Sequence, residues 1–182
     1  YNFTEHQDNP ISHASTGSTS FDGTNDYIAL TSQALTGTFT ISMWINPDDI
    51  TSVNLLGLSS ADTDYLYIDG SNDIAFASSD LSVTFSDSNI SANVWQHIVI
   101  TRDGSNVPRF YKNGSLTETE SADAGTLTFD QIGRYHDGST GGADGNFFNG
   151  SMANVGIWNR ALSASEVQGI MYKQYSDLGS VD

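Results

Sequence analysis

Short apolar segments, each ended by Ser, Asp, Asn or Gly, are the feature that most limits what this chain can fold into. The clearest is TFTISMWIN at 38–46, where large apolar side chains occupy alternate positions, at Phe39, Ile41, Met43 and Ile45. Alternation places one set of side chains on a single face of a strand. Trp44 falls on the opposite face, so we expect both faces of this strand to be covered.

A β-hairpin is predicted at RFYKNGSLTETE, because Asn113-Gly114 supplies the two positive-φ residues of a type I′ turn. About twelve such segments follow one another at a spacing of roughly 8 to 12 residues, with turn residues between them. This spacing is typical of a sandwich or a barrel. The sequence therefore predicts an all-β fold.

One helix is predicted near the end of the chain. Ser163 and Glu166 form the Ser-x-x-Glu pattern of a capping box, which satisfies free backbone amides at a helix start. We expect the helix to run from about 164 to 173 and to plug one end or edge of the sandwich. Its buried side would consist of Val167, Ile170 and Met171.

The charge balance limits the partners. The net charge is −16, from 22 acidic and 6 basic residues, and such a chain repels nucleic acid and anionic lipid. No segment approaches the ~18 to 20 apolar residues of a membrane span. We therefore expect neither nucleic-acid binding nor membrane insertion. There is no cysteine, so disulfides play no part.

The chain divides into one domain with short flanks. Residues 1–17 are polar and unpatterned and are interpreted as a linker or a docked N-terminal arm, with the domain at 18–175 and a tail at 176–182. Because the first residue is Tyr1, the simplest interpretation is a piece of a longer or processed polypeptide. The expected partners then include other domains of that polypeptide, and a homo-oligomer is a further possibility.

Five motifs in order carry a family resemblance between about residues 19 and 173. FDGTNDYIAL, FTISMWINPD, VWQHIVITRDG, FYKNGSL and FFNGSMANVGIWNRALSASEV resemble the laminin-G-like, concanavalin A-like lectin/glucanase domains. The resemblance implies a two-sheet antiparallel jelly-roll β-sandwich with one short C-terminal helix, and a role in glycan binding or adhesion. Many relatives have Ile-Asp-Glu where this chain has Met152, Ala153 and Asn154, and an Asp there helps to hold a structural calcium in glucanase-like relatives. Ala153 cannot ligate a metal.

Two loops contain the residue types that hold sugars, namely aromatic rings with Asn, Asp and backbone groups around them. The richer is GRYHDGSTGGADGNFF at 133–148, a long glycine-rich loop of the kind that often carries function. Its candidate ligand-binding residues are Tyr135, His136, Asp137, Asp144 and Asn146. The second loop, at 59–73, offers Tyr65 and Tyr67.

The second loop could also bind calcium, because Asp62 and Asp64 could supply two oxygen ligands to the flexible cage that Ca²⁺ prefers. The full pattern of a known calcium loop is absent. Aspartate-rich loops also keep a protein soluble without any metal, so the solvated interpretation stays open.

Catalytic residues are not recognisable. Glu118 and Glu120 share a strand face, but their strand carries Thr and Ser rather than an aromatic cleft, so we expect a noncatalytic edge. His97 shares a strand with Gln96 and Arg102, and a satisfied core or cleft histidine is the favoured interpretation.

The sequence thus favours a non-catalytic carbohydrate-binding or adhesion module of a larger extracellular, cell-surface or virion-surface protein, with a glycan contacted by rim loops. The alternative is a structural or decorating sandwich of a virion or cell-surface assembly without a sugar site. A polysaccharide-degrading enzyme is the third and weakest interpretation.

Overall fold

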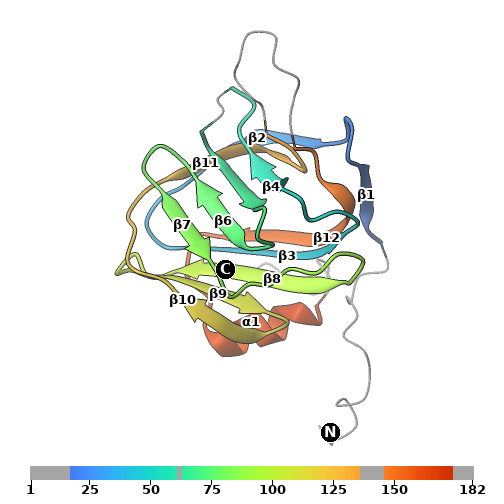
Figure 1. The fold of residues 1–182 in the computed structure, drawn as a ribbon. Helices are drawn as coiled ribbons and strands as arrows, with labels where there is room; N and C mark the ends of the chain where they lie inside the picture. The colour runs from blue at the N-terminus through green and yellow to red at the C-terminus, as the bar shows by residue number, and fades with distance from the viewer. Residues whose placement is uncertain (1–16, 61–62, 136–145, 174–182) are drawn as a thin grey trace, which may run out of the picture.

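Two six-stranded antiparallel sheets make up the fold in the computed structural model, which describes residues 17–60, 63–135 and 146–173 (Figure 1). Sheet A has the strand order β1 (Thr19–Asp22), β12 (Asn149–Trp158), β3 (Phe39–Pro47), β8 (Gln96–Arg102), β9 (Pro108–Lys112) and β10 (Ser115–Thr119). Sheet B has the order β2 (Ile28–Leu35), β11 (Leu127–Ile132), β4 (Val53–Gly57), β5 (Tyr65–Ile68), β6 (Ile74–Ala77) and β7 (Ser82–Phe85). The predicted jelly-roll β-sandwich is confirmed.

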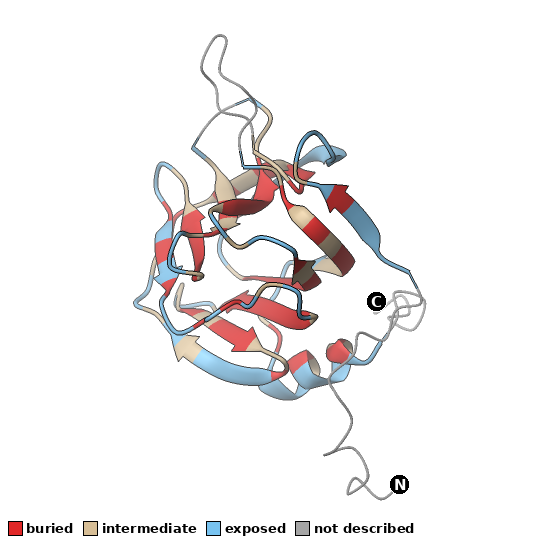
Figure 2. Cartoon of the chain, turned by 45° about the vertical axis from the view of Figure 1, so that its right-hand side comes forward, coloured by how far each residue is buried: buried red, intermediate tan, exposed pale blue. Residues whose placement is uncertain are grey.

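The main core lies between the two sheets, where the inward-facing side chains of both are buried (Figure 2). Aromatic rings join the layers: Phe85 of sheet B stacks on Phe110 of sheet A, with ring centroids 5.4 Å apart. Both rings are completely buried. Truncating such a ring to alanine typically costs about 3–5 kcal/mol, so this contact contributes strongly to holding the sheets together.

The predicted hairpin joins β9 to β10. Asn113 and Gly114 have φ values of 51° and 78°, as a type I′ turn requires. The Asn113 side-chain oxygen also accepts a hydrogen bond of 2.9 Å from the backbone amide of His97, which ties the turn to β8.

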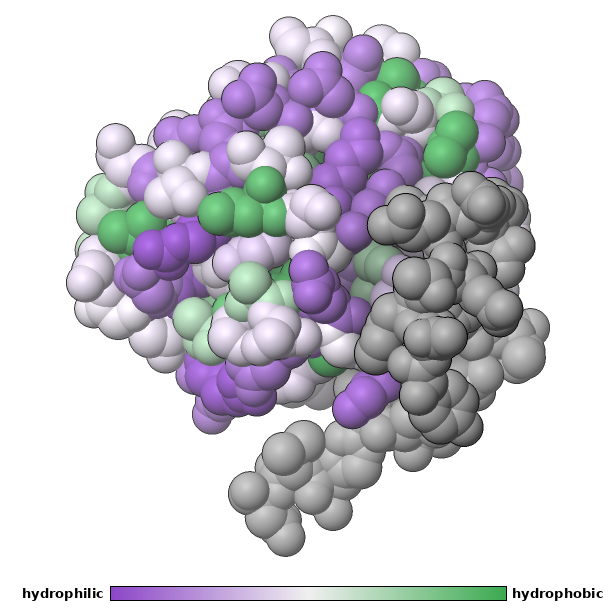
Figure 3. Space-filling view, turned by 90° about the horizontal axis from the view of Figure 1, so that it is seen from below, coloured by the Kyte–Doolittle hydropathy of each residue, from purple (hydrophilic) through white to green (hydrophobic). Residues whose placement is uncertain are grey.

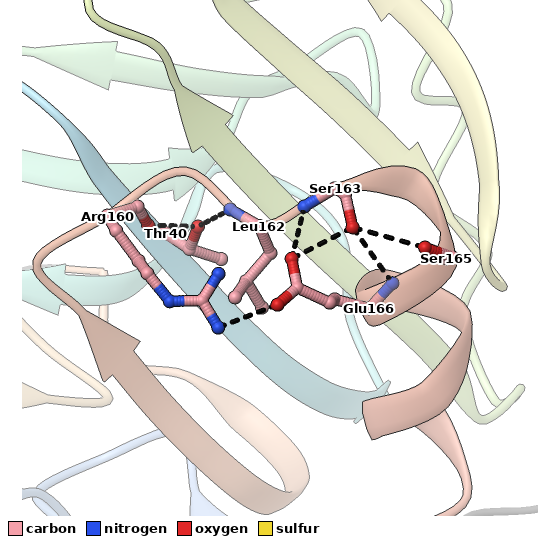
Figure 4. Close-up of polar contacts among 6 residues, drawn as sticks. All are labelled: Thr40, Arg160, Leu162, Ser163, Ser165 and Glu166. Atoms are coloured by element: carbon pink, nitrogen blue, oxygen red, sulfur yellow. Dashed lines mark hydrogen bonds and ion pairs between the residues drawn. The ribbon is translucent and has the colours of Figure 1, made fainter. Parts of the chain in front are cut away.

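The helix α1 (Ala164–Met171) begins at the predicted capping box (Figure 4). The Ser163 hydroxyl accepts from the Glu166 amide, and the Glu166 carboxylate accepts from the Ser163 amide at 2.8 Å. Arg160 makes an ion pair of 2.8 Å with the same carboxylate. These bonds hold the turn that leads from β12 into the helix.

Thr40 of β3 anchors this turn to sheet A. Its hydroxyl donates to the Arg160 carbonyl at 2.8 Å and accepts from the Leu162 amide at 2.9 Å (Figure 4). Leu162 packs with Val167 of the helix on Val99 and Tyr111 of sheet A. The connection is therefore fixed to the sheet on both its polar and its apolar side.

The position of α1 differs from the prediction. The helix does not plug an end of the sandwich: it packs on the outer face of sheet A, where Met171 contacts the cluster of Trp44 and Ala153, and it lies beneath sheet A in Figure 1. Trp44 is completely buried, as expected for a strand covered on both faces. Seen from the helix side, the surface is mostly hydrophilic, with small separate hydrophobic patches (Figure 3).

The structure also corrects one strand boundary. The apolar run VWQHIVITR at 94–102 is typical of a strand, but β8 begins only at Gln96. The reason is the Gln96 amide, which donates to the carbonyls of Ser91 and Val94 and accepts from the Ser91 amide, so it holds 91–94 as a turn. Within the described ranges, no helix is long and apolar enough to cross a membrane.

Candidate functional site

Tyr65 and Tyr67 point to the outer face of sheet B. They alternate along β5 with Leu66 and Ile68, both completely buried in the core, so the two tyrosines face away from the core. Each tyrosine is half-buried. Their ring centroids are 5.0 Å apart with the planes at 65°. The strand therefore presents two neighbouring aromatic side chains at the surface.

Tyr135 reaches the same face from the segment that follows β11. A Cβ atom added to Gly57 of β4 would collide with the backbone of Arg134 and the Cβ of Tyr135. The chain can therefore lie this close to the sheet because residue 57 is glycine. The Tyr135 ring lies 4.7 Å from the Tyr65 ring, centroid to centroid, at 36°.

The two loops selected from the sequence thus meet, and Tyr65, Tyr67 and Tyr135 form one group, here called the tyrosine cluster. The register explains the meeting: Gln131 of β11 pairs with Gly57, and Gly57 pairs with Tyr65. Beyond Tyr65 and Tyr67 the next strand, β6, presents only Ala77 and Ala75 in the paired positions. The rings therefore stand beside a floor of small side chains, a geometry suited to a flat, partly apolar ligand.

A buried asparagine lies next to the cluster. Asn54 pairs with Tyr67 across β4 and β5 and is 1% exposed. Its backbone and side-chain amides donate to the Asn146 carbonyl at 3.0 and 3.1 Å, but its side-chain oxygen has no hydrogen-bond partner among the residues that the structure describes. Asn54 was not selected from the sequence, although a polar residue inside the apolar run VNLLG was the available signal. It fixes the end of the 133–148 loop to sheet B.

Asn146, a predicted ligand-binding residue, is exposed and has a positive φ of 59°. Its carbonyl is occupied by Asn54, so its side chain is the part that remains to contact a ligand. The predicted residues His136, Asp137 and Asp144 lie outside the described residues. Of the predicted binding residues, the structure therefore brings together Tyr65, Tyr67 and Tyr135, with Asn146 on the adjoining loop.

The acidic groups near the cluster take part in local hydrogen bonds. The Asp64 carboxylate accepts from the Thr128 amide at 3.0 Å, and the Asp130 carboxylate accepts from the amide and hydroxyl of Ser59. Asp69 accepts from the amides of Ser71 and Asp73 and so forms the turn after β5. These carboxylates shape the loops around the tyrosines.

Burial raises the pKa of Tyr67, and the nearby Tyr65 and Asp69 add to the shift. Because the pKa is raised, the Tyr67 hydroxyl keeps its proton throughout the ordinary pH range. The phenol is therefore available as a neutral donor and acceptor of hydrogen bonds to a ligand.

The described residues do not show the two predicted calcium ligands, Asp62 and Asp64, together at one site. Asp64 uses its carboxylate on the Thr128 amide, and Asp62 lies outside the described residues. No group of three or more His, Cys, Asp or Glu that could hold a metal occurs among the residues described. Ala153, at the position of the relatives' aspartate, packs with Trp44 and Met171. Calcium binding stays a prediction.

The glutamate pair lies elsewhere. Glu118 belongs to β10 at the edge of sheet A, and Glu120 follows it; a hydrogen bond between the two carboxyls raises the pKa of Glu120. The Glu118 carboxylate also accepts from the Ser86 hydroxyl and the Asp87 amide. The pair therefore sits on the sheet opposite to the tyrosine cluster and has a role in joining β10 to the end of β7.

His97 is a core histidine, as expected, but it is satisfied only in part, because within the described residues only Nε2 of its two ring nitrogens has a hydrogen-bond partner. It is 2% exposed beneath α1, next to the Trp44 ring, and its Nε2 lies 2.9 Å from the Ser42 hydroxyl. Burial lowers the pKa of His97 to about 4. Because the pair is sealed from solvent, it cannot act on an external substrate as a serine–histidine dyad would.

Fold and site together define a jelly-roll domain of the lectin-like type, with an aromatic group on one outer sheet face. The family comparison agrees: the model of the concanavalin A-like lectin/glucanases superfamily, the laminin-G-like type, matches residues 22–168. The chain belongs to this family.

Solved structures share the fold at low sequence identity. Domain 4 of AbnA, a GH43 extracellular arabinanase from Geobacillus stearothermophilus solved with arabinotriose, has 17% identity over 85% of this chain and 76% of its own, with a TM-score of 0.66. A heptameric SAP-like pentraxin from Limulus polyphemus has 18% identity over 85% and 83%, with a TM-score of 0.60. The CBM40 of Ruminococcus gnavus IT-sialidase, bound to α2,3 sialyllactose, has 12% identity over 88% and 100%, with a TM-score of 0.59. Curated protein sequences gave no match.

Proposed function

We propose that this domain is a non-catalytic carbohydrate-binding or adhesion module of a larger extracellular or surface protein, and that a glycan lies against the tyrosine cluster. The observation that carries the proposal is the convergence of Tyr65, Tyr67 and Tyr135 on one outer sheet face. Aromatic rings bind the apolar C–H faces of sugars, while phenol hydroxyls and nearby amides supply hydrogen bonds.

The other outer face supports the same assignment. Helix α1 covers the centre of sheet A, burying Trp44, Val99 and Tyr111. Sheet B carries half-buried aromatic side chains at the corresponding place. A ligand of extended, flat shape therefore fits sheet B far better than sheet A.

A non-catalytic role is supported by the positions of the candidate acids. Retaining glycosidases need two carboxyls about 5–5.5 Å apart across the bound sugar. The close glutamate pair, Glu118 and Glu120, belongs to sheet A and is engaged with Ser86 and Asp87. The proposal expects no reducing ends to be released from β-glucan or arabinan by the wild-type chain.

The test is affinity electrophoresis and a glycan array with the wild-type chain and the variants Tyr65→Ala and Tyr67→Ala, each with and without calcium. Loss of one ring from a stacked site is expected to weaken binding at least about tenfold. Tyr172→Ala is the matched control, because Tyr172 is 65% exposed at the end of α1 on the other sheet.

Two results would contradict the proposal. Binding that is unchanged in Tyr65→Ala and Tyr67→Ala would move the site away from the tyrosine cluster. No sugar bound in either calcium condition would favour the structural or decorating role. A dependence on calcium would instead support the predicted metal site at the loop of Asp62 and Asp64.

A further inference from the structure

The positive charges of this chain can be followed individually, because all six lysine and arginine residues lie in the described ranges. Three of them belong to β8 and β9 of sheet A. Arg102 is completely buried, stacks on Phe39 and donates to the Gly37 and Gly125 carbonyls. The Arg102 guanidinium is therefore bonded inside the fold and cannot contact a ligand.

The other two cations of sheet A are also engaged. Arg109 makes an ion pair of 2.7 Å with Asp103, and the Lys112 ammonium donates to the carbonyls of Ser88 and Asn89. Both residues belong to β9, in the sheet opposite to the tyrosine cluster. Neither can meet a ligand on the outer face of sheet B.

Two more cations belong to the helix region. Arg160 pairs with Glu166 at the start of α1, and Lys173 follows the end of the same helix. Since α1 packs on the outer face of sheet A, these charges lie on the far side of the sandwich from the tyrosine cluster.

Arg134 is the sixth, and it directly precedes Tyr135. Its guanidinium lies 3.8 Å above the Tyr27 ring, and its Nε donates to the Gln131 side chain at 2.9 Å. Tyr27 immediately precedes β2, whereas Tyr65 and Tyr67 belong to β5, and the strands β11 and β4 lie between β2 and β5. The Arg134 guanidinium is thus engaged by the Tyr27 ring and by the side chain of Gln131, a residue that pairs with Gly57 beside Tyr65.

Negative charges, by contrast, lie close to the cluster. Asp69 is near enough to Tyr67 to help raise its pKa, whereas the Asp64 carboxylate, next in sequence to Tyr65, accepts from the Thr128 amide of β11. The whole chain carries −16, so the field around the site is negative. His97 is buried, and the remaining histidines lie outside the described residues; a histidine of ordinary pKa is neutral at pH 8.

From this distribution we infer that the tyrosine cluster takes neutral glycans and discriminates against sugars that carry carboxylate or sulfate groups. The inference rests on the proposed function and deepens it. An acidic sugar would lose its hydration at the site, whereas the cations either lie on the far side of the sandwich or are engaged by other groups of the protein. The sugar would also be repelled by the nearby carboxylates. A neutral sugar makes the same aromatic contacts without that cost.

The test uses paired neutral and acidic probes at pH 8: lactose against sialyllactose, which adds an acidic sugar, and methyl-esterified against de-esterified homogalacturonan, which differ only by the ester on the carboxyl group. Binding is measured in 20 mM and 500 mM NaCl. In every pair that binds, the neutral member is expected to bind at least about fivefold more tightly at low salt. The difference should shrink at high salt, because the Debye length falls well below its value of about 10 Å at 0.1 M.

A matched pair of variants assigns the effect to the local charge. Asp69→Asn keeps an oxygen for the turn but removes the charge near Tyr67, and it should raise the affinity for the acidic probe while leaving the neutral probe unchanged. Asp22→Asn is the control, since Asp22 forms a similar turn at the edge of sheet A, accepting from the amides of Thr24 and Asn25. It should change neither probe.

The outcomes separate the two proposals. Tighter low-salt binding of the acidic probe that is lost in Tyr65→Ala would overturn this inference and leave the carbohydrate-binding site in place. Equal affinity for both members of each pair would overturn it as well. Failure to bind any neutral or acidic glycan would refute the proposed function itself.

Discussion

His97 should contribute to the acid destabilisation of this domain, in addition to the carboxylates whose pKa is lowered in the native state. Burial lowers the pKa of His97 from 6.5 to about 4, so the native state keeps this imidazole neutral. Its Nε2 lies 2.9 Å from the Ser42 hydroxyl, and its Nδ1 is buried without a hydrogen-bond partner in the described part of the chain. A second proton would leave an N–H at Nδ1 with no acceptor.

Proton linkage determines whether the free energy of unfolding rises or falls with pH. Above pH 6.5 the imidazole is neutral in both the folded and the unfolded chain, and the group has no effect on the unfolding free energy. As pH falls below 6.5, the unfolded chain binds the proton and the native chain does not, so stability is lost until pH reaches about 4. Each pH unit costs about 1.4 kcal/mol, which gives about 3 kcal/mol over the whole window.

The assay is urea unfolding between pH 8 and pH 4.5 for the wild-type chain and for His97→Gln. Glutamine can reach the Ser42 hydroxyl but does not titrate, and both proteins share their carboxylates. The difference between their unfolding free energies should therefore shift steadily against the wild type as pH falls below 6.5. A difference that is constant over this range would refute the reasoning, because it would mean that His97 is protonated equally in the native and unfolded chains.

Three further substitutions test other contacts. Ser163→Ala removes the hydroxyl that accepts from the Glu166 amide, and urea unfolding should show a loss of about 1 kcal/mol; an unchanged midpoint would mean that the cap is dispensable. Gly57→Ala should push Tyr135 off the sheet, weakening glycan binding and shifting the Tyr135 ring signals in NMR spectra, and unaltered signals would contradict the close approach described. Arg102→Lys loses the planar fork that serves three carbonyls and should cost about 2 kcal/mol in thermal or urea unfolding; full retention of stability would contradict the structural role of this buried arginine.

Local sequence signals predicted the local structure well. The alternation at 38–46 correctly predicted β3, and the Asn113-Gly114 pair predicted the hairpin turn. The Ser163–Glu166 spacing predicted the start of the helix. Each of these depends on residues a few positions apart, so each can be recognised without knowledge of the fold. The helix ends at Met171, two residues before the predicted end.

Features that depend on distant residues were not predictable. The sequence selected Tyr65, Tyr67 and Tyr135, but that they touch depends on the pairing of β11 with β4 and of β4 with β5. The resting place of α1 depends on the same kind of information, since the apolar outer face of sheet A forms only after β3, β8 and β9 have paired. Asn54 was missed because its partner, the Asn146 carbonyl, comes from a loop far along the chain.

The attachment of β1 and α1 to the same sheet gives the domain a polarity. The described chain enters through β1, an edge strand of sheet A, and leaves through α1 on the back of that sheet. Both described ends of the chain therefore lie on sheet A, the layer opposite to the tyrosine cluster. Attachment through sheet A would leave the outer face of sheet B, with the tyrosine cluster, accessible to a ligand on another surface.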